Sequence, residues 1–355
     1  MSDRIGPQLF FEDLAPWNDN SNSVWLASTL LLHRNVDKFH FPGKLALDKR
    51  KQLVSFLQKE LTVLPGFDSP VFLRSEESSP IDKEFLVEHC LTHESFTQAL
   101  QGEGFFFDMK GDCLISVNVD DHLHFHNIDI KGELEKSWNR LSNLEIELGK
   151  SVAYSYSPKF GFLTANPQTS GTGLIVNLYL QLSALIHTGA LEEQLLAIEE
   201  ESVEAQGLLG GSKEWVGDLV SLRNRYCLGV NEESILASLR SISTRLLAEE
   251  SAQRSKLRSE ESREVKDKVA RAYGLLSHSY QIETVEALNE IALLKLGLDL
   301  GWIQGVSMSE LNRLFFTCRR GHLLRHLQGK VALEEVAHRR AEFIHSALKQ
   351  VTITI

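Results

Sequence analysis

The sequence predicts an α+β fold with a largely antiparallel sheet and flanking helices, followed by an all-helical C-terminal domain. Three observations lead to this prediction. Strand-like apolar runs adjoin through short turns, helical periods separate them, and beyond about residue 250 only the helical period remains. Strands joined by hairpins favour an antiparallel sheet over a doubly wound parallel one. The change of pattern predicts two domains, residues 1–252 and residues 256–355.

The first part of the chain alternates between the two periods. A buried strand is expected within residues 24–36, and a helix within residues 46–62, where leucines recur at every fourth position. A hairpin is expected over residues 104–120, with its turn at Lys110-Gly111-Asp112. The next expected elements are a strand at 123–130, a helix at 133–148, a short strand at 162–166, a turn at 167–173 and an apolar stretch to Ile186.

The last hundred residues are helical by their apolar period. Residues 254–268 mix both signs of charge, which is typical of a solvated helix surface. Stripes of apolar residues at spacings of three and four predict amphipathic helices. These stripes are Leu288, Ile291, Leu294 and Leu298; Leu311, Leu314 and Phe315; and Ala341, Ile344 and Leu348.

Composition excludes several classes of protein. Of the 355 residues, 43% are hydrophobic and 24% are charged, so the chain can bury a core and is not disordered. A net charge of −11 argues against nucleic acid or an anionic membrane as a partner. No apolar run approaches the roughly 18 residues of a membrane-spanning helix. Four scattered cysteines without a CxxC pair and the absence of a secretory signal predict a cytoplasmic protein.

Three histidines alternate with other residues after the predicted hairpin. On a strand His122, His124 and His126 would share one face, as metal ligands do. Spacing identifies no fourth ligand. A solvated or site-lining face is therefore preferred, and no metal site is predicted.

Two further features have an ordinary structural explanation. The backbone amides of Gly171-Thr172-Gly173 could hold a phosphate, although a tight turn needs glycine in any case. An anion or metabolite sensor that uses this turn stays open as an alternative function. The pairs Arg319-Arg320 and Arg339-Arg340 could grip an anion, but a solvated helix surface is favoured for both.

Several motifs occur in a fixed order along the chain. They are Asn118-Val119-Asp120-Asp121-His122-Leu123, the segments at residues 161–167 and 171–174, the glycine-rich loop at 207–214, and Leu228-Gly229 with Glu232-Glu233. Together they resemble the guanidino (phosphagen) kinases, the ATP:guanido phosphotransferases, and residues 270–276 and 296–301 resemble the helical C-terminal domain of McsB-type bacterial protein arginine kinases. The resemblance implies the guanidino-kinase, glutamine-synthetase-like fold, and transfer of phosphate from ATP, with magnesium, to arginine side chains.

The resemblance also identifies positions where the family uses arginine to hold the nucleotide. The residues at these positions are Thr29, Leu31, His124, Ile175 and Gln206. Only His124 among them can become cationic. Leu31 and Ile175 would place apolar surface where phosphates should lie, which is unfavourable without compensation.

The catalytic positions implied by the resemblance have changed as well. Asp120 replaces a glutamate, Gly211 replaces a second glutamate and Asn166 replaces a cysteine, while Arg340 is the remnant of a phosphoarginine receptor. Losing one preorganised electrostatic group typically costs about 10²–10³ in rate. The expected function is therefore a catalytically impaired pseudokinase, acting as a scaffold or regulator in stress response and protein quality control.

One enzymatic alternative stays open, and the resemblance suggests partners. An active but divergent arginine kinase would use Asp120 as its base and take cations from elsewhere, such as Lys159 and Arg223. The implied partners are further copies of the chain, a zinc-binding activator protein of the McsA type and the Clp protease machinery. Self-association is expected through residues 256–355.

Overall fold

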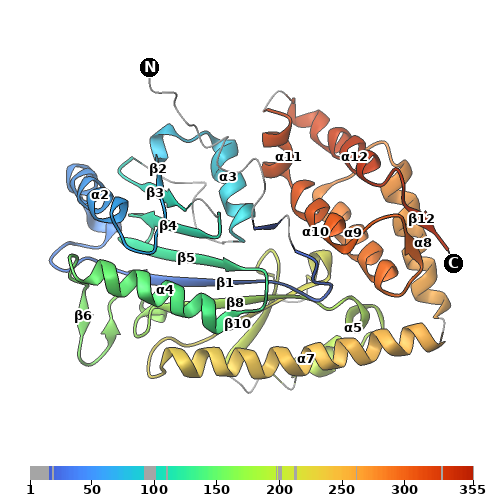
Figure 1. Cartoon of the computed structure of the whole chain (residues 1–355), viewed down its shortest axis with the longest axis horizontal. Helices are drawn as coiled ribbons and strands as arrows, with labels where there is room; N and C mark the ends of the chain where they lie inside the picture. Colours follow the sequence, from blue (N-terminus) through green and yellow to red (C-terminus); the bar gives the residue numbers. More distant parts are fainter. Residues whose placement is uncertain are drawn as a thin grey trace. The chain divides into compact units, whose positions relative to one another are not determined.

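A run of apolar side chains forms the long strand β1 (Trp25–Arg34) inside a sheet whose strand order is β2-β3-β4-β5-β1-β8-β10-β9 (Figure 1). The computed structural model describes residues 16–17, 20–91, 101–108, 111–196, 198, 202–211, 214–260, 262–328 and 331–354. These residues fall into two compact units. One consists chiefly of residues 28–177 and 224–237, and the other of residues 17–27, 178–223 and 238–355.

The first unit contains most of the antiparallel sheet. Its elements are β1, α2 (Leu47–Thr62), β2 (Val71–Arg74), α3 (Pro80–His89), β3 (Gly104–Phe107), β4 (Cys113–Val117), β5 (Leu123–Asp129), α4 (Leu134–Gly149), β6 (Tyr156–Ser157), β7 (Gly161–Phe162) and the start of β8 (Leu174–Gln181). The pairs β2–β3, β3–β4, β4–β5 and β5–β1 are all antiparallel. This arrangement confirms the predicted fold class, with α4 covering one face of the sheet against β5.

Most of the elements expected in this unit are confirmed. The strand at 24–36, the helix at 46–62, the strand at 123–130 and the helix at 133–148 correspond to β1, α2, β5 and α4. The expected hairpin is β3–β4, although Lys110 of its predicted turn lies outside the described residues. The apolar stretch to Ile186 becomes β8 and the short helix α5 (Ser183–His187).

The short strand expected at residues 162–166 is wrong beyond Phe162, where β7 ends. The Thr164 hydroxyl donates to the carbonyl of Asn166 at 2.7 Å, and the Asn166 side chain accepts from the amide of Gln168. Side-chain bonds to nearby backbone compete with strand pairing and favour turns. The chain therefore enters a short 3₁₀ helix, Pro167–Thr169, instead of continuing the strand.

The second unit combines one edge of the sheet with a helical array. Its elements are the end of β8, α5, α6 (Leu191–Leu196), β9 (Val203–Gly207), β10 (Leu219–Asn224), α7 (Glu232–Glu260), α8 (Arg263–His278), α9 (Thr284–Asp299), β11 (Ile303–Gln304), α10 (Met308–Thr317), α11 (Arg320–His326), α12 (Val336–Ala347) and β12 (Thr352–Ile353). The three predicted apolar stripes fall on α9, α10 and α12, whose stripe residues are buried apart from the half-buried Leu298. The C-terminal region is not entirely helical, because β11 and β12 form a small antiparallel pair.

Helix α7 is continuous through the expected domain boundary at residues 252–256. The compact units have other limits, so the boundary stays a prediction. The charge run is not entirely solvated either, because Arg254 is buried and its Nε donates to Glu250 at 2.7 Å. The fully buried Glu250 accepts from the amides of Ala184 and Leu185 at 3.0 and 2.9 Å, which caps the start of α5. An acidic group that pairs with a cation and accepts two amides can be buried at a tolerable cost.

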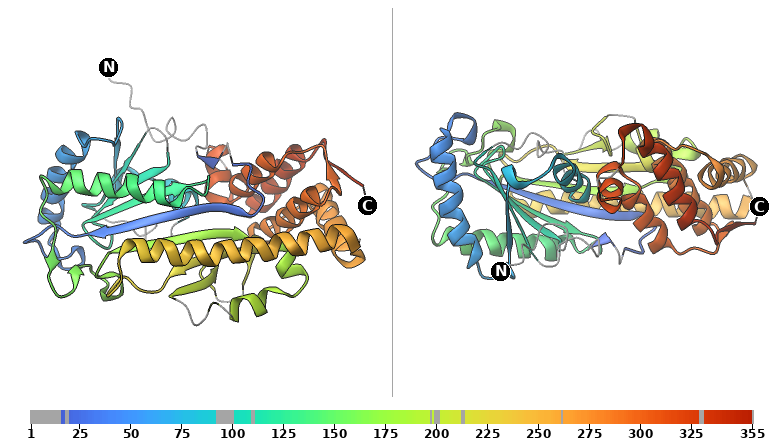
Figure 2. Two further views of the ribbon diagram at one scale, coloured as in Figure 1. Left: turned by 60° about the horizontal axis from the view of Figure 1, so that its bottom comes forward. Right: turned by 90° about the horizontal axis from the view of Figure 1, so that it is seen from above.

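None of the described helices is long and apolar enough to cross a membrane. Figure 2 gives two further views of the same ribbon, and in the left view α7 can be followed along its whole length.

Candidate functional site

One face of the central strands carries most of the positions that the sequence singled out. The antiparallel register places His33 opposite His124, Leu31 opposite His126 and Thr29 opposite Ile128. Side chains that lie directly opposite one another across a strand pair project to the same face. We call this surface of β1, β5 and the first part of β8 the histidine face.

Strand β8 adds Ile175 to the histidine face. The side-chain amide of Asn177 donates to the Thr29 hydroxyl at 3.2 Å, so Asn177 lies on the same side as Thr29, and Ile175, two residues earlier, shares that side. The structure therefore brings together four of the five nucleotide positions expected from the sequence. These positions are Thr29, Leu31, His124 and Ile175. Leu31 and Asn177 are half-buried, whereas Ile175 and Thr29 are buried.

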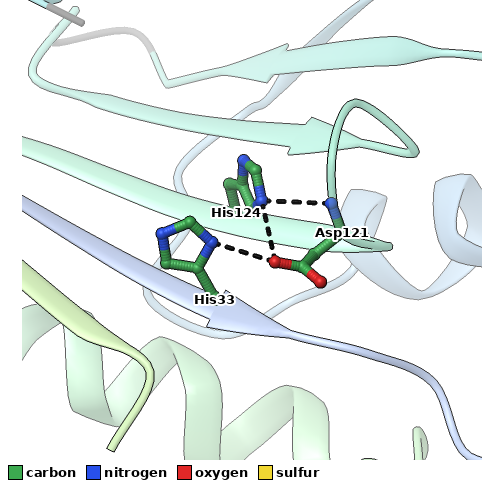
Figure 3. A group of neighbouring side chains, drawn as sticks. All are labelled: His33, Asp121 and His124. Atoms are coloured by element: carbon green, nitrogen blue, oxygen red, sulfur yellow. Dashed lines mark hydrogen bonds and ion pairs between the residues drawn. The ribbon is translucent and has the colours of Figure 1, made fainter. Parts of the chain in front are cut away.

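A buried cluster of His33, Asp121 and His124 lies at one end of the histidine face (Figure 3). Asp121 Oδ2 is 3.0 Å from His33 Nδ1 and 3.4 Å from His124 Nε2. The two imidazole rings lie edge to face, with centroids 4.3 Å apart. Local spacing did not reveal this cluster, because His33 reaches it only through the pairing of β1 with β5.

The carboxylate of Asp121 is held on both oxygens. Its Oδ1 accepts from the side-chain amide of Asn35 at 2.5 Å and from the amide of Ala165 at 2.6 Å, while Oδ2 faces the two histidines. Burial by itself would raise the pKa of Asp121, but the hydrogen bonds and positive charge available from His124 and His33 outweigh burial and hold that pKa well below its usual range. Asp121 is thus a fixed, ionised carboxylate.

The three alternating histidines do not form one group. His122 precedes β5, its Nδ1 accepts from the amide of Val36, and its Nε2 donates to the carbonyl of His40, each at 3.0 Å. Burial lowers the pKa of His122 to about 4, so the ring is neutral at neutral pH. His126 lies opposite Leu31, and only His124 of the three joins the cluster. Of the predicted solvated or site-lining face, the solvated part is wrong, since all three histidines are buried.

The expected catalytic positions in the first unit are exposed. Asp120 lies on the surface of the turn between β4 and β5. Asn166 is exposed and caps the 3₁₀ helix after β7. Of the cations considered in compensation, Lys159 is exposed and lies 5.0 Å from the ring of Phe160.

The remaining expected positions belong to the other unit. Gln206 lies on β9, where its amide donates to Glu204 at 2.7 Å. Gly211 follows β9, and its carbonyl accepts from the amide of Gly207. A Cβ built on Gly211 would lie 3.4 Å from Oε2 of Glu214, so a carboxylate lies beside the position where the resemblance implies one. Arg223 is half-buried on β10.

Two backbone amides of the glycine turn at residues 171–173 donate hydrogen bonds within the protein. The amide of Gly171 donates to the carbonyl of Phe162 at 3.0 Å, and the amide of Thr172 donates to the carbonyl of Cys227 at 2.9 Å. Gly171 has a φ of +114°, and a Cβ there would lie 2.1 Å from the Cys227 carbonyl oxygen. Glycine is therefore needed for close backbone packing, and the turn does not present these two amides to an anion.

The C-terminal arginine pair is split by the helix. Arg339 is half-buried, and its guanidinium donates to Glu342 at 2.7 Å at the helix surface. Arg340 is buried, and its Nε and Nη1 donate to the carbonyls of Cys318 and Ile282, each at 2.8 Å. The prediction of a solvated pair is wrong for Arg340, whose guanidinium is hydrogen-bonded to the backbone of two other segments.

Comparison with known proteins gives a consistent result over nearly the whole chain. Residues 54–253 match the model of the ATP:guanido phosphotransferase C-terminal catalytic domain, and residues 262–354 match the C-terminal domain of protein-arginine kinase McsB. A protein-arginine kinase from Chlamydia pneumoniae is 33% identical over 337 residues, which cover 94% of this chain and 92% of that protein. One from Bacillus cereus is 29% identical over 344 residues, covering 95% and 97% respectively.

Two solved kinase structures resemble this chain in fold. Lombricine kinase matches with a TM-score of 0.54 at 17% identity, covering 66% of this chain and 68% of that one. The duplicated taurocyamine kinase from Schistosoma mansoni, solved with bound transition-state-analogue components, matches with a TM-score of 0.57 at 20% identity. The match covers 64% of this chain and 33% of that chain.

Proposed function

This chain is a protein-arginine kinase homologue and belongs to the ATP:guanido phosphotransferase family, and from that premise we propose that it is a catalytically impaired pseudokinase. In this proposal the kinase fold serves as a scaffold or regulator in protein quality control. The proposal concerns loss of chemistry within a retained fold.

The composition of the histidine face is the observation that carries the proposal. Phosphoryl transfer depends on cations that hold and neutralise the triphosphate. None of the four family arginine positions gathered on this face carries a guanidinium, and two of them, Leu31 and Ile175, are apolar. His124 directs its Nε2 toward Asp121, which already supplies a negative charge.

These residues do not fit ATP with magnesium. A phosphate placed against Leu31 and Ile175 would lose its hydration without gaining a donor, which costs free energy. Magnesium keeps several waters and is usually held through substrate phosphates together with one or two carboxylates. Without held phosphates, the exposed Asp120 is a weak anchor for the ion.

A divergent but active kinase is the second candidate, and the carboxylates favour it. Asp120 is exposed and so open to a substrate guanidinium, and Glu214 lies beside the position of Gly211. A carboxylate can orient a guanidinium and accept its proton. An anion sensor built on the turn at 171–173 is disfavoured, because two of its amides are used within the protein.

Partners are proposed from the family alone. They are further copies of the chain, a zinc-binding activator protein of the McsA type and the Clp protease machinery. The retained apolar stripes of α9, α10 and α12 support a folded C-terminal region that can present a binding surface. Light scattering of the full-length chain tests self-association, and a plain monomer at all concentrations would contradict it.

Titration with Mg-ATP, followed by mass spectrometry for phosphoarginine, tests the central proposal. We expect no saturable binding up to ~1 mM nucleotide, the upper end of common KM values, and no phosphoarginine on a model protein substrate. The Bacillus cereus relative, assayed in parallel, is the positive control for the substrate and the detection. Micromolar binding followed by phosphoarginine would reject the pseudokinase and establish the divergent kinase.

A further inference from the structure

We propose that His33, Asp121 and His124 form a binding site for a divalent transition-metal ion of the Zn²⁺ class. The proposal does not depend on whether the chain binds ATP. It revises the expectation from the sequence, which considered His122, His124 and His126 and predicted no metal site. The structure selects a different set, in which one histidine comes from β1, one from β5 and the carboxylate from the turn before β5.

The donor atoms have the separations that a tetrahedral ion requires. Ligands at about 2.0–2.1 Å from Zn²⁺ lie about 3.3–3.4 Å from each other in a tetrahedron. Asp121 Oδ2 lies 3.0 Å from His33 Nδ1 and 3.4 Å from His124 Nε2, and all three donors lie within 4.8 Å of one another. Small side-chain rotations would thus complete three corners, leaving the fourth to water or to a ligand.

The groups around the carboxylate hold it as metal-site neighbours do. Hydrogen bonds from Asn35 and from the amide of Ala165 both end on Oδ1 of Asp121. They fix the plane of the carboxylate and direct Oδ2 toward the two imidazoles. Outer hydrogen bonds of this kind orient ligands and commonly change metal affinity by about 10–100-fold.

The surroundings of His124 Nε2 also favour a cation. This nitrogen is 3.3 Å from the amide nitrogen of Asp121, a donor, and 3.4 Å from Asp121 Oδ2, an acceptor. A single imidazole nitrogen cannot accept from the first and donate to the second in one protonation state. A metal ion between Nε2 and Oδ2 would receive lone pairs from both atoms, and it would replace the 3.3 Å hydrogen bond that Nε2 accepts from the Asp121 amide.

Chemistry and position narrow the identity of the ion. Two imidazole nitrogens and one carboxylate suit zinc, cobalt, nickel or copper better than magnesium or calcium, which prefer oxygen ligands. The ion would offset the charge of Asp121, whose side chain is 2% exposed. The side chain of His33 is 11% exposed and gives the ion a path from solvent. The register of β1 and β5 holds the two histidines opposite one another, so the site is largely preorganised.

Titration of the full-length, chelator-treated protein with Co²⁺, followed by competition with Zn²⁺, tests the site without nucleotide. We expect one Co²⁺ per chain, with the visible absorption of a tetrahedral complex, displaced by Zn²⁺. His33→Gln and His124→Gln should weaken binding at least about 100-fold, beyond the effect of an outer-sphere change. His126→Gln is the matched control, because His126 is a buried histidine on the same face outside the cluster, and its affinity should change little.

A further variant separates ligation from folding. His33→Cys keeps a metal ligand and adds a thiolate, so its Co²⁺ complex should gain a sulfur-to-metal charge-transfer band in the near ultraviolet. Circular dichroism and Tm without metal show whether each variant is folded. The proposal is overturned if the folded wild-type chain binds no stoichiometric Co²⁺ or Zn²⁺, or if His126→Gln weakens binding as much as the cluster variants. Activity with Mg-ATP is a separate measurement and does not affect this result.

Discussion

The two faces of β1 differ in the charged side chains that they carry and in how these are paired. On the face toward α4, Leu30 and Leu32 are fully buried and the guanidinium of Arg34 lies 3.4 Å from the ring centroid of Phe162. Arg34 Nε donates to Glu145 at 2.8 Å, and Nη1 donates to two backbone carbonyls. The opposite, histidine face has Thr29, Leu31 and His33 in alternate positions.

The difference shows which cations the fold itself requires. Arg34 is held by fixed partners and contributes to packing, so removing it would leave a buried carboxylate unpaired. On the histidine face, packing requires no cation, and none of the family arginine positions gathered there carries a guanidinium. Under the proposed function, the chain keeps the charges that its packing requires and lacks those expected to bind the nucleotide.

The largest effect is expected from placing an arginine on the wrong face of β1. Leu30→Arg puts a charge at a fully buried position and should cost about 4–5 kcal/mol or more, whereas Leu31→Arg, at a half-buried position, should cost about 1 kcal/mol or less. Urea unfolding of the two variants measures the difference. Equal destabilisation would show that both faces are packed alike and would break the comparison.

Loss of the buried ion pair is the next largest effect. Arg34→Ala should lower the free energy of unfolding by about 3–5 kcal/mol, because Glu145 is left without its cation. The double variant Arg34→Met, Glu145→Leu should recover part of that loss, since an apolar pair needs no desolvation of charge. Lys159→Ala, which removes an exposed cation, is the control and should change stability by no more than about 0.5 kcal/mol.

Acid should weaken the fold through His122. Its pKa is about 4 in the folded protein and 6.5 in the unfolded chain, so between these values the unfolded chain binds the extra proton. The free energy of unfolding should therefore fall as the pH drops from about 6.5 to 4, by about 3 kcal/mol from this residue. Asp121, whose pKa is depressed, should add a further loss as the pH falls below about 4.

His122→Asn isolates that contribution. The asparagine oxygen can accept from the amide of Val36 in place of Nδ1, and it does not titrate in this range. Urea unfolding from pH 7 to pH 4 should show a smaller slope for the variant than for the wild type. The same slope in both proteins would assign the pH dependence to other groups.

The smallest effect, no gain of kinase activity, is expected from a substitution in the glycine-rich loop. Gly211→Glu places a carboxylate where the family resemblance implies one, and under the proposed function it should still give no phosphoarginine by mass spectrometry, because the positions expected to hold the triphosphate would still lack arginine. Gly211 has no positive φ, and its Cβ would make only ordinary contacts with Glu214, so the variant should fold. Turnover from this single change would show that ATP already binds.

Sequence periodicity predicted the elements better than it predicted the site. Leucines at every fourth position identified α2, and apolar residues at spacings of three and four identified α4, because one buried face follows directly from the helical period. His33 was missed, because it meets His124 through strand register, which local spacing does not encode. Asp121 was noticed only as part of a motif, and its role depends on Asn35 and Ala165, which are distant in sequence.

Neighbouring arginines show the same limit on a helix. Arg339 and Arg340 are adjacent in sequence, yet the helical turn of about 100° per residue leaves Arg339 half-buried at the surface and places Arg340 in the interior. The interior position of Arg340 depends on two carbonyl groups, of Cys318 and Ile282, at the ends of other segments. Composition indicated a solvated pair because long charged side chains are usually exposed.

The cap of α5 by Glu250 limits how this protein can be divided or recombined. The two matched family segments end at residue 253 and begin at residue 262, and that junction lies at the end of α7. A gene fragment ending at residue 253 would encode Glu250 and the amides that it caps, but not Arg254, whose guanidinium neutralises it. The end of the matched catalytic-domain segment therefore separates Glu250 from its cation. A chimera made by joining this chain to a relative should fold only when the junction lies beyond Arg254.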